Sequence, residues 1–561
     1  MGRKKSVYGD TLTKEYEDSL DKEKREERGI YYTPSSLVSY MVKRAKEFSK
    51  KSVKTSFKIL DPSCGVGEFL KKIEEEFENV EIHGVDIDSE AIEIARKRIE
   101  NKDYSNVKFF NKDFLIDFEE DAYDFILGNP PYLGEKNHKE MFDILKEHEL
   151  GKLYYEKGMD YFYFFIEKSL DILKPGGILG FVTSSYWPRA DFANRLRERI
   201  KREGYFLEVL DFCEYRVFDT AKGHHSMVFF LKKSEEIESF QYKKLKKTKS
   251  SLEEILKNID SKEMWEIKEC KNRNTINKFN HFYFGTEEEL KIIEKIKLNS
   301  KYILSEMCEI NQGIVSGADR SKDSEKGIFV LSKEELKEKG IYNEEYLKPF
   351  FKSKDISRYK TKEECDWKIL YLNKKFEIEK YLEVENHMKS YQNSLEERRE
   401  CKKGVIPWYS LQWPRKQKIF EGSKIVVPQR SRENIFGFNQ IPWYASADVY
   451  FLTEFQISYK VLLGILNSSL IYFWLYNMGK KKGEYLELYQ KPLGEIPIAK
   501  FNYDFEEKMN NMIDLVFESG TESVQRDIDN LVYEMYGLEM DEIKKIEDFL
   551  LSKRKNLLFP G

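Results

Sequence analysis

The chain has 561 residues, a length that fits two to four domains at about 150 residues each. It carries 95 basic and 99 acidic residues, a net charge of -4, and 40% of its residues are hydrophobic. This composition excludes collagen-like, low-complexity and coiled-coil proteins. The most apolar run, residues 461–475, is broken by Asn467, Ser468 and Ser469, and a membrane-spanning helix needs about 20 apolar residues. We therefore expect no membrane association.

Cysteines and histidines are scattered along the chain. The six cysteines form no CxxC pair and have no histidine at metal-ligand spacing. No apolar stretch follows the basic residues at the amino terminus, so no secretory signal is expected. This pattern is typical of reduced thiols in a cytoplasmic protein and predicts neither disulfides nor a metal site.

Residues 1–30 are almost wholly polar and are expected to form an arm. From 31 to 232, short apolar runs alternate with helical patterns. Strands are expected at 57–61, 80–86, 107–110, 123–128, 178–183, 205–212 and 226–231, and helices from 68, at 89–100 and at 160–173, with breakers at 174–177. This alternation predicts a doubly wound α/β domain with a mostly parallel, Rossmann-like sheet.

The rest of the chain changes character. Residues 233–285 are rich in Lys, Glu and Ser with thin periodicity, which indicates a linker or a loosely packed edge. Residues 286–500 contain short strand-like pieces separated by Gly and Pro, and these predict a second, mixed α+β domain. Residues 501–561 are expected to be helical.

A glycine-bearing turn lies between the first expected strand and the helix that follows it. Within residues 61–67, Gly65 and Gly67 let the backbone approach a ligand without a Cβ. The spacing lacks the third glycine of GxGxxG and the lysine of a P-loop, so a nucleoside-type ligand is favoured over a phosphate cradle. The alternative is a tight turn alone.

Acidic side chains follow the next two strands. Asp86 ends the second strand about 20 residues after the turn, where a carboxylate accepts hydrogen bonds from ribose hydroxyls. Asp113 follows the third strand and is expected to accept from an adenine amino group, with the Phe114 ring against the base. The alternative for Asp86 is a helix cap.

The fourth strand is followed by Asn129-Pro130-Pro131-Tyr132. The side-chain oxygen of Asn129 and the carbonyl of Pro130 are each able to accept one hydrogen of a planar amino group such as N6 of adenine, which localises its lone pair as a methyl group transfers. Two prolines keep these acceptors rigid, and Tyr132 offers a face for an extruded base. The alternative is a turn with an aromatic plug.

These motifs, in this order, resemble the gamma-type, TaqI-like amino-methyltransferases that act on adenine N6 in DNA. The leading segment is Gly29-Ile30-Tyr31-Tyr32-Thr33-Pro34, and Asp160-Tyr161-Phe162 resembles the segment that helps close the cofactor pocket. The resemblance implies S-adenosylmethionine as methyl donor. It also implies that Phe218 sandwiches the flipped adenine against Tyr132, the alternative being a core phenylalanine. The implied cofactor-binding residues are Tyr31, Thr33, Pro34, Asp61, Pro62, Cys64, Gly65, Gly67, Asp86, Ile87, Asp113, Phe114, Asn129, Pro131 and Tyr161.

Three segments of the second half also resemble sporulation-associated clostridial adenine methyltransferases of this type. They are residues 311–317, which look like the opening of a recognition domain, 397–413 and 445–450. The resemblance implies double-stranded DNA as partner.

The charge of the second half is uneven. Between residues 398 and 432, ten Lys or Arg face two Glu, a net charge of +8, with Trp408, Tyr409, Trp413 and Phe420 interleaved. Basic side chains pair with phosphates and aromatic rings stack on bases, although such a run is also typical of a solvated face. The DNA-binding residues expected from this run and from a second basic loop are Arg398, Arg399, Lys402, Lys403, Trp413, Arg415, Lys416, Gln429, Arg430, Arg432, Lys480, Lys481 and Lys482.

Three other interpretations stay open. The same chemistry suits an adenine in RNA or a glutamine side-chain amide of a protein, and the fold is also compatible with an inactive nucleic-acid-binding regulator. We expect a monomeric, bacterial, cytoplasmic enzyme. No nuclease motif is found, so any restriction endonuclease would be a separate protein.

Overall fold

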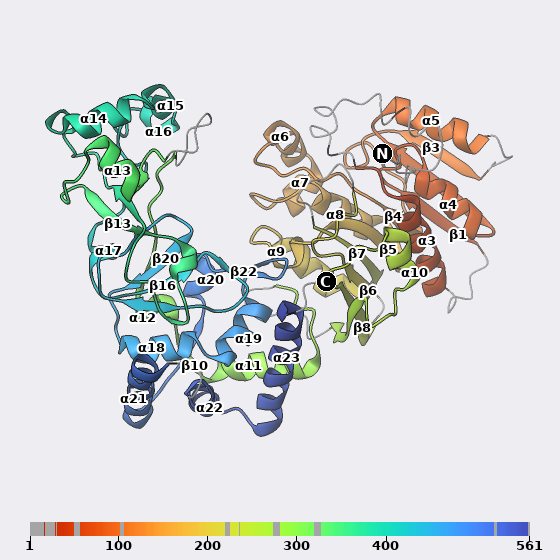
Figure 1. The fold of residues 1–561 in the computed structure, drawn as a ribbon. Helices are drawn as coiled ribbons and strands as arrows, with labels where there is room; N and C mark the ends of the chain where they lie inside the picture. Colours follow the sequence, from red (N-terminus) through yellow and green to blue (C-terminus); the bar gives the residue numbers. More distant parts are fainter. Residues whose placement is uncertain are drawn as a thin grey trace. The chain divides into compact units, whose positions relative to one another are not determined.

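The computed structural model describes residues 16, 29, 31–49, 56–100, 106–218, 225–234, 236–272, 281–318, 327–520 and 524–558. Contacts divide the chain into two compact units that meet in sequence at residues 290 and 291 (Figure 1). Of the expected arm at 1–30, only Tyr16 and Gly29 lie among the described residues.

The first unit is built on a nine-stranded sheet in the order β3-β2-β1-β4-β5-β7-β6-β8-β9. The pairs from β3 to β5 and the pair β6–β8 are parallel, whereas β7 runs antiparallel between β5 and β6, and β9 runs antiparallel to β8. The strands are β1 (Phe57–Asp61), β2 (Val80–Asp86), β3 (Val107–Asn111), β4 (Tyr123–Gly128), β5 (Leu173–Ser184), β6 (Gly204–Asp211), β7 (Ser226–Lys233), β8 (Ser239–Leu245) and β9 (Trp265–Lys271). The doubly wound, mostly parallel sheet expected from the sequence is therefore confirmed.

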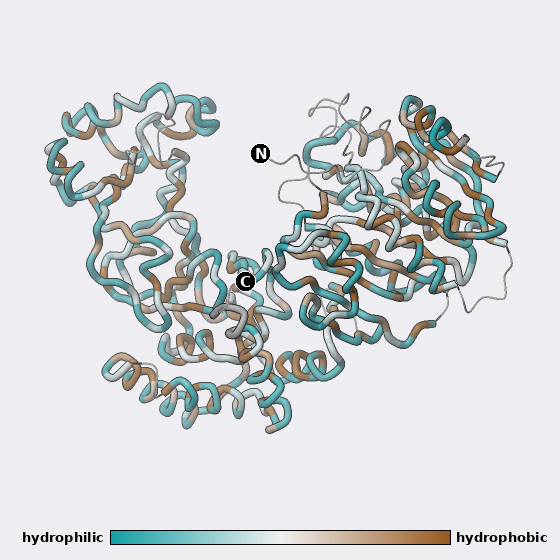
Figure 2. The backbone as a smooth tube through the Cα atoms, turned by 45° about the vertical axis from the view of Figure 1, so that its right-hand side comes forward, coloured by the Kyte–Doolittle hydropathy of each residue, from teal (hydrophilic) through white to brown (hydrophobic). Residues whose placement is uncertain are grey.

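Helices flank this sheet in two groups that lie to either side of the strands in Figure 1. One group is α3 (Ser35–Ser49), α4 (Glu68–Glu76), α5 (Ser89–Glu100) and α10 (Leu252–Lys257), and the other is α6 (Lys139–Glu147), α7 (Glu149–Tyr154), α8 (Phe162–Ile172) and α9 (Asn194–Glu203). Because both faces are covered, the central strand β4 is buried along its whole length. In Figure 2 hydrophobic colour accordingly concentrates along the strands, and the helices alternate between the two colours.

The helix expected at 160–173 ends before the breakers at 174–177, since α8 ends at Ile172, but the breakers form no turn because β5 starts at Leu173 and runs through them. Pairing with β4 passes from Leu173 to Ile178 while β4 advances only from Tyr123 to Phe125. Gly176, at φ 77°, takes up the extra residues. The Pro-Gly-Gly sequence thus makes a bulge rather than a turn.

The linker expected within residues 233–285 is wrong, and the alternative of a sheet edge agrees with the structure. β8 pairs parallel with β6, and β9 then pairs with β8 at the end of the sheet. Trp265 and Cys270 are buried. Lys243 is a residue type expected at the surface, but it is also buried. Ion pairs with Glu208 and Asp260 neutralise its charge. Such charged pairs are why the apolar periodicity of this segment is thin.

The second unit contains four small sheets, with strand orders β11-β20-β16-β18-β14, β12-β15-β13-β19, β17-β22-β21 and β10-β23. The strands are β10 (Ser300–Ile303), β11 (Glu309–Gln312), β12 (Val330–Ser332), β13 (Leu347–Phe351), β14 (Tyr359–Lys360), β15 (Trp367–Leu370), β16 (Lys424–Pro428), β17 (Arg430–Ser431), β18 (Gly437–Asn439), β19 (Tyr444–Ala445), β20 (Val449–Thr453), β21 (Lys481–Lys482), β22 (Tyr485–Glu487) and β23 (Pro497–Ala499). This agrees with the expected mixed domain of short strands.

Helices complete the second unit. Those before β16 are α11 (Glu287–Asn299), which starts at the boundary, α12 (Leu304–Met307), α13 (Lys333–Lys339), α14 (Leu382–Lys389), α15 (Gln392–Glu396), α16 (Arg399–Lys402) and α17 (Lys418–Glu421). Those after β20 are α18 (Tyr459–Leu466), α19 (Ser469–Met478), α20 (Gln490–Gly494), α21 (Tyr503–Ser519), α22 (Gln525–Met535) and α23 (Met540–Leu558). The last three form the helical carboxyl-terminal segment that was expected.

The apolar run at 461–475 forms two buried helices, α18 and α19, which meet at 62°. Asn467 occupies the break and exchanges hydrogen bonds with the backbone of Phe436. Within the described ranges, no single helix has the length and apolarity to cross a membrane, and this bent pair satisfies those criteria only when its two helices are taken together.

Candidate active site and nucleic-acid interface

The site lies where the strand order of the first unit reverses. β1 pairs with β2 on one side and with β4 on the other. In an open α/β sheet, ligands bind at the carboxyl ends of the strands at such a switch point. The glycine turn follows β1 and the Asn129 segment follows β4, so the fold brings these two motifs together. Ser63 Oγ donates to the carbonyl of Asn129 over 3.2 Å and links them directly.

Asp86 shapes the glycine turn. Its carboxylate accepts from the backbone N–H of Gly65 over 2.7 Å and from that of Asp88 over 2.9 Å. Gly65 has φ 49°, and a Cβ built on it meets no atom within 4 Å. The glycine here thus borders open space, and the neighbouring Ile87 is 70% exposed. A polar carboxylate, a bare backbone and an exposed apolar side chain suit a ribose and a planar base.

The side chain of Asp61, at the end of β1, supports the glycine turn. It is buried, and burial raises the pKa of its carboxyl well above the usual range. Its Oδ1 accepts from the N–H of Ser63 over 3.2 Å. A Cβ on Gly128 would come within 2.7 Å of the same oxygen, so a glycine is needed at the end of β4. Pro62 and Cys64 are buried with it. These three residues shape the turn, and their expected direct contact with a cofactor stays a prediction.

The side chain of Phe114 lies in the core, and the expected stacking of its ring on a base stays a prediction. It is 3% exposed and its ring packs against those of Phe118 and Phe165. Asp113 is half-buried and accepts from the N–H of Leu115 over 2.8 Å, so it also orders the turn after β3.

Both polar atoms of the Asn129 side chain are held within the chain. Its Nδ2 donates to the carbonyl of Tyr31 over 2.7 Å, and its Oδ1 accepts from the hydroxyl of Tyr132. This arrangement fixes which end of the amide is the acceptor. A carbonyl oxygen has two lone pairs, so Oδ1 keeps capacity for a second donor. Pro130 is buried behind it, which keeps the segment rigid.

Three aromatic rings meet at this segment. The ring centroids of Tyr132 and Phe218 are 6.2 Å apart at 63°, and Tyr31 lies 5.5 Å from Tyr132 and 6.0 Å from Phe218. The structure brings Tyr132 and Phe218 together, but their rings touch and both are buried. A base has no open slot between them in this state. The ring of Tyr31 stacks on that of Tyr132, and its expected contact with the cofactor stays a prediction.

Asp160 was not identified as a functional residue, although the segment that carries it was. It is buried, and it accepts from the N–H of Leu133 over 3.0 Å and from the hydroxyl of Tyr186 over 2.6 Å. Burial raises the pKa of its carboxyl. Tyr161 donates its backbone N–H to the carbonyl of Leu133 over 2.9 Å. Asp160 thus anchors the residue that follows Tyr132.

Tyr16 was also missed, because the amino-terminal arm reads as uniformly polar. Its hydroxyl donates to Asp88 over 2.9 Å, and its ring packs with Val66 and Ala91. Thr33 and Pro34 precede α3, and Pro34 accepts from the first turn of that helix. Tyr16 therefore lies on the glycine turn and beside the Asp86 strand end.

Two basic residues of the run at 398–432 are structural. Arg398, expected to bind DNA, is buried and donates to the carbonyls of Leu395, Ser316 and Trp408. Lys424 is fully buried, with its ammonium on the carbonyls of Gly422 and Ile441. Phe420 is a core ring. The DNA-binding role of Arg398 is therefore wrong, because all its neighbouring acceptors lie inside the unit.

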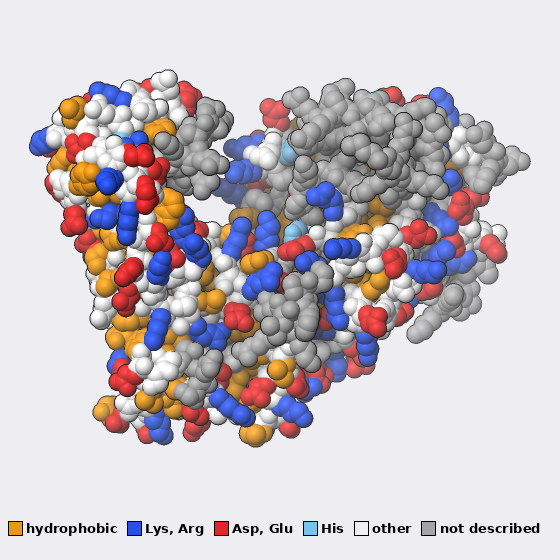
Figure 3. Space-filling model, viewed as in Figure 1, with side chains coloured by type: hydrophobic (Ala, Val, Ile, Leu, Met, Phe, Trp, Pro, Cys, Tyr) orange, Lys and Arg blue, Asp and Glu red, His pale blue; other side chains and the backbone are white. Residues whose placement is uncertain are grey.

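Four other residues expected to bind DNA are exposed and lie close together. β17 pairs with β22 and β22 with β21, which places Arg430 and Arg432 beside the loop of Lys480 and Lys482. Lys481 lies over the ring of Tyr476. Gln429 precedes this sheet, while Arg399, Lys402, Lys403, Trp413, Arg415 and Lys416 are exposed elsewhere on the unit. Figure 3 shows Lys and Arg interspersed with Asp and Glu over the visible surface. Among the described residues, no group of His, Cys, Asp and Glu is arranged to hold a metal.

The fold and site define a class: a Rossmann-like methyltransferase sheet joined to a TaqI-like specificity domain that ends in helices. Residues 97–218 match the Eco57I restriction-modification methylase model, residues 45–147 the methyltransferase small domain, and residues 348–498 the TaqI-like C-terminal specificity domain.

Individual relatives span nearly the whole chain. The Type II methyltransferase M.HindII of Haemophilus influenzae is 25% identical over 93% of this chain and 100% of that protein. M.BanIII of Aneurinibacillus aneurinilyticus is 24% identical over 92% and 98%, respectively. The solved structure of the Type IIL restriction-modification enzyme MmeI in complex with DNA aligns with a TM-score of 0.64 at 14% identity, covering 98% of this chain and 82% of that one. This last likeness concerns the fold.

Proposed function

We propose that this protein is an S-adenosylmethionine-dependent, site-specific DNA methyltransferase that modifies N6 of an everted adenine. The observation that carries the proposal is the position of Asn129 and Tyr132 at the end of β4, linked through Ser63 to the glycine turn. The full-length similarity to Type II methyltransferases supports the DNA substrate. The match to a specificity domain supports site selection.

The residues around the glycine turn fit the cofactor. Gly65 borders open space, Asp86 presents a carboxylate for ribose hydroxyls, and Ile87 exposes an apolar surface for the adenine ring. When bound there, S-adenosylmethionine supplies an activated methyl group. The ring of Tyr16 packs against Val66 of the turn. The other cofactor contacts implied by the resemblance, among them Thr33, Pro131 and Tyr161, stay predictions.

In this proposal, Asn129 activates the adenine amino group. Its Oδ1 and the Pro130 carbonyl accept the two hydrogens of the adenine amino group, so the nitrogen lone pair is drawn out of conjugation. The Nδ2 bond to Tyr31 and the Tyr132 hydroxyl prevent the amide from flipping. Asp160 holds the backbone of Leu133 and so keeps the segment in place.

Base entry requires the aromatic cluster to open. Tyr132 and Phe218 must separate for a purine to stack between them, and Tyr31 must leave the face of Tyr132. Base–aromatic stacking contributes about 1–3 kcal/mol per base. That energy offsets the loss of the weaker contacts among the three rings.

The second unit supplies duplex binding in this proposal. The exposed Arg432 and Lys482 present positive charge to phosphates, next to Arg430 and Lys480, which share an ion pair with Glu487. An RNA adenine or a protein glutamine would not need a specificity domain, so this unit favours DNA over those substrates. The intact Asn129 geometry argues against an inactive regulator.

The proposal is tested by incubating purified protein with labelled S-adenosylmethionine and genomic DNA, RNA or a protein extract. We expect label in DNA, recovered as N6-methyladenine. Label in RNA or protein alone, or as methylcytosine, would overturn the assignment. The resemblance to clostridial sporulation-associated enzymes, a monomeric state and a separate cognate endonuclease stay predictions.

A further inference from the structure

Three segments that are far apart in the sequence form one junction in the second unit. Ile314 makes a parallel bridge with Ser446, and Val315 makes an antiparallel bridge with Trp413. The N–H of Ile314 donates to the carbonyl of Ala445 over 2.9 Å, and Val315 and Trp413 exchange two backbone hydrogen bonds of 3.0 and 2.8 Å. The residues around Trp413 are thereby fixed against the end of β11.

The junction is tight and locally strained. A Cβ on Gly313 would lie 2.2 Å from the carbonyl of Ser446, so only glycine fits there. Arg415 adopts φ 65°, a left-handed conformation that is unfavourable for a residue with a side chain. Its guanidinium donates to the carbonyl of Gly313 and to Oε1 of Gln312, and the hydroxyl of Tyr371 donates to its carbonyl over 2.7 Å. Such strain persists only where surrounding contacts over-determine it.

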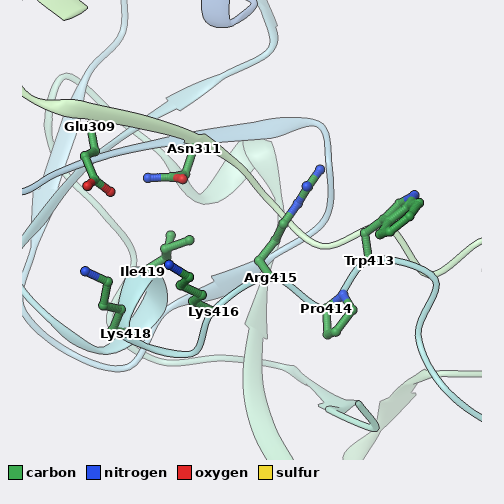
Figure 4. A pocket seen from close by; sticks show the side chains of 8 residues that line it. All are labelled: Glu309, Asn311, Trp413, Pro414, Arg415, Lys416, Lys418 and Ile419. Carbon is green, nitrogen blue, oxygen red and sulfur yellow. The ribbon is translucent and has the colours of Figure 1, made fainter. Parts of the chain in front are cut away.

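A hollow of about 300 Å³ opens beside this junction. Glu309 and Asn311 face it from alternate positions of β11, and Lys416 and Lys418 face it from the opposite side, as Figure 4 shows. Trp413 and Arg415 continue its wall, and Trp413 is 43% exposed. An exposed indole is able to stack on a nucleic-acid base.

The polar atoms in the hollow are suited to a base edge. The Nδ2 of Asn311 is buried and, among the residues that the structure describes, has no hydrogen-bond partner. A buried donor without an acceptor is unfavourable, so this amide is suited to an incoming acceptor. Glu309 adds an acceptor for an amino group. An amide reads adenine through its N6 and N7 atoms, and a carboxylate accepts from N4 of cytosine.

We propose that this hollow, centred on Asn311, reads the edge of one base in the DNA recognition sequence. Lys416 pairs with a phosphate that flanks that base, while Lys418 is ion-paired with Glu454, and the indole of Trp413 packs against the strand. The inference rests on the proposed function, because it assumes a DNA substrate. It separates one residue that specifies sequence from neighbours that contribute affinity.

The test compares methylation across a plasmid library in which each position of the recognition sequence is varied. Asn311→Asp replaces the Nδ2 donor with an acceptor of equal size, and we expect the base preference at one position to change by about 10-fold or more. Glu309→Gln, at an exposed position, provides a second variant that does not depend on tolerance of a buried charge. It should relax the preference at the same position or at the adjacent one.

Two controls separate reading from binding. Lys416→Gln should lower methylation at every sequence by a similar factor, and Lys545→Gln, at an exposed position of α23, should leave both rate and preference unchanged. Unchanged base preference in both Asn311→Asp and Glu309→Gln, with the wild-type protein active, would overturn this inference alone. A wild-type protein that methylates no DNA would overturn the proposed function and this inference together.

Discussion

The hydroxyl of Tyr132 donates a hydrogen bond of 2.5 Å to Oδ1 of Asn129, three residues earlier in the same segment. The tyrosine expected to stack on a base therefore also sets the orientation of the amide that would accept from that base. The second lone pair of Oδ1 is left for the amino group. Stacking and polarisation are thus joined in one short segment, and substitutions there should separate the two effects.

Removal of the hydroxyl alone should have a moderate effect. In Tyr132→Phe the ring remains, and the lost hydrogen bond contributes about 1 kcal/mol, so kcat should fall roughly 5- to 10-fold. Asn129→Ala removes the acceptor itself and should lower kcat by about 100-fold or more. Single-turnover methylation measures both, with cofactor affinity unchanged as the control. Equal losses in the two variants would contradict the separate roles.

Asp86 should control cofactor affinity. Its carboxylate holds Gly65 and Asp88 through two backbone N–H groups, and it faces the expected ribose. Hydrogen bonds to charged groups contribute about 1.5–3 kcal/mol, so Asp86→Ala should raise the dissociation constant of S-adenosylmethionine roughly 10- to 100-fold. Isothermal titration calorimetry measures this directly. Asp121→Ala, at an exposed position before β4, is the matched control, and the same affinity in both variants would refute the role of Asp86.

Opening of the aromatic cluster should be visible with 2-aminopurine at the target position of a duplex. Its fluorescence rises when the base leaves the stack. Phe218→Ala removes one stacking face, so the everted population should fall roughly 5- to 100-fold while cofactor binding persists. Fluorescence in this variant equal to that of the wild type would indicate that Phe218 is only a core residue, the alternative expected from its burial.

Exposed and buried basic residues of the second unit should behave differently. Arg432→Gln and Lys482→Gln each remove an exposed charge, so the slope of log affinity against log salt should fall by about 0.9 per substitution if each contacts one phosphate. Arg398→Gln should instead reduce the free energy of unfolding by about 1–3 kcal/mol, because three carbonyls lose their donor. DNA-binding titrations at several salt concentrations measure the slopes, and urea unfolding measures the loss of stability. An unchanged slope in Arg432→Gln and Lys482→Gln would remove both from the interface.

Lys424 should make stability depend on pH. Burial lowers the pKa of its ammonium to about 7, whereas the unfolded chain keeps the ordinary value near 10.4. Between these values the unfolded state binds more protons, so stability rises with pH, by roughly 2–3 kcal/mol from pH 7 to pH 9. Lys424→Met should lack this increase. Urea unfolding at the two pH values tests the difference, and parallel behaviour of the two proteins would show that Lys424 does not titrate in this range.

The strands of the first unit were predictable because each is a short apolar run that ends at a polar or glycine-bearing turn. The expected ranges at 57–61, 80–86 and 123–128 coincide with β1, β2 and β4. The meeting of the glycine turn and Asn129 also followed, because parallel strands bring their carboxyl ends to one edge. β8 and β9 were less predictable, because β8, the strand that contains Lys243, buries charge through partners that are distant in sequence.

The direction of individual side chains was not predictable. Arg398 and Arg399 are adjacent and equally basic, yet one is buried and the other is exposed. Phe114 and Tyr132 are both aromatic residues in turns after strands, but only the second adjoins Asn129. Likewise, no local pattern indicates that residues 314, 413 and 446 meet. Such contacts depend on tertiary packing, which local periodicity does not encode.

The central claim is that Asn129 activates an exocyclic adenine nitrogen. Long-read sequencing of a plasmid from cells that express the chain tests it most directly, with Asn129→Ala expressed in parallel. We predict N6-methyladenine at one defined sequence context in the wild type and none in the variant, while the purified variant still binds S-adenosylmethionine. Full adenine methylation by Asn129→Ala would contradict the account. So would a plasmid that stays unmodified in cells that express the folded wild-type protein.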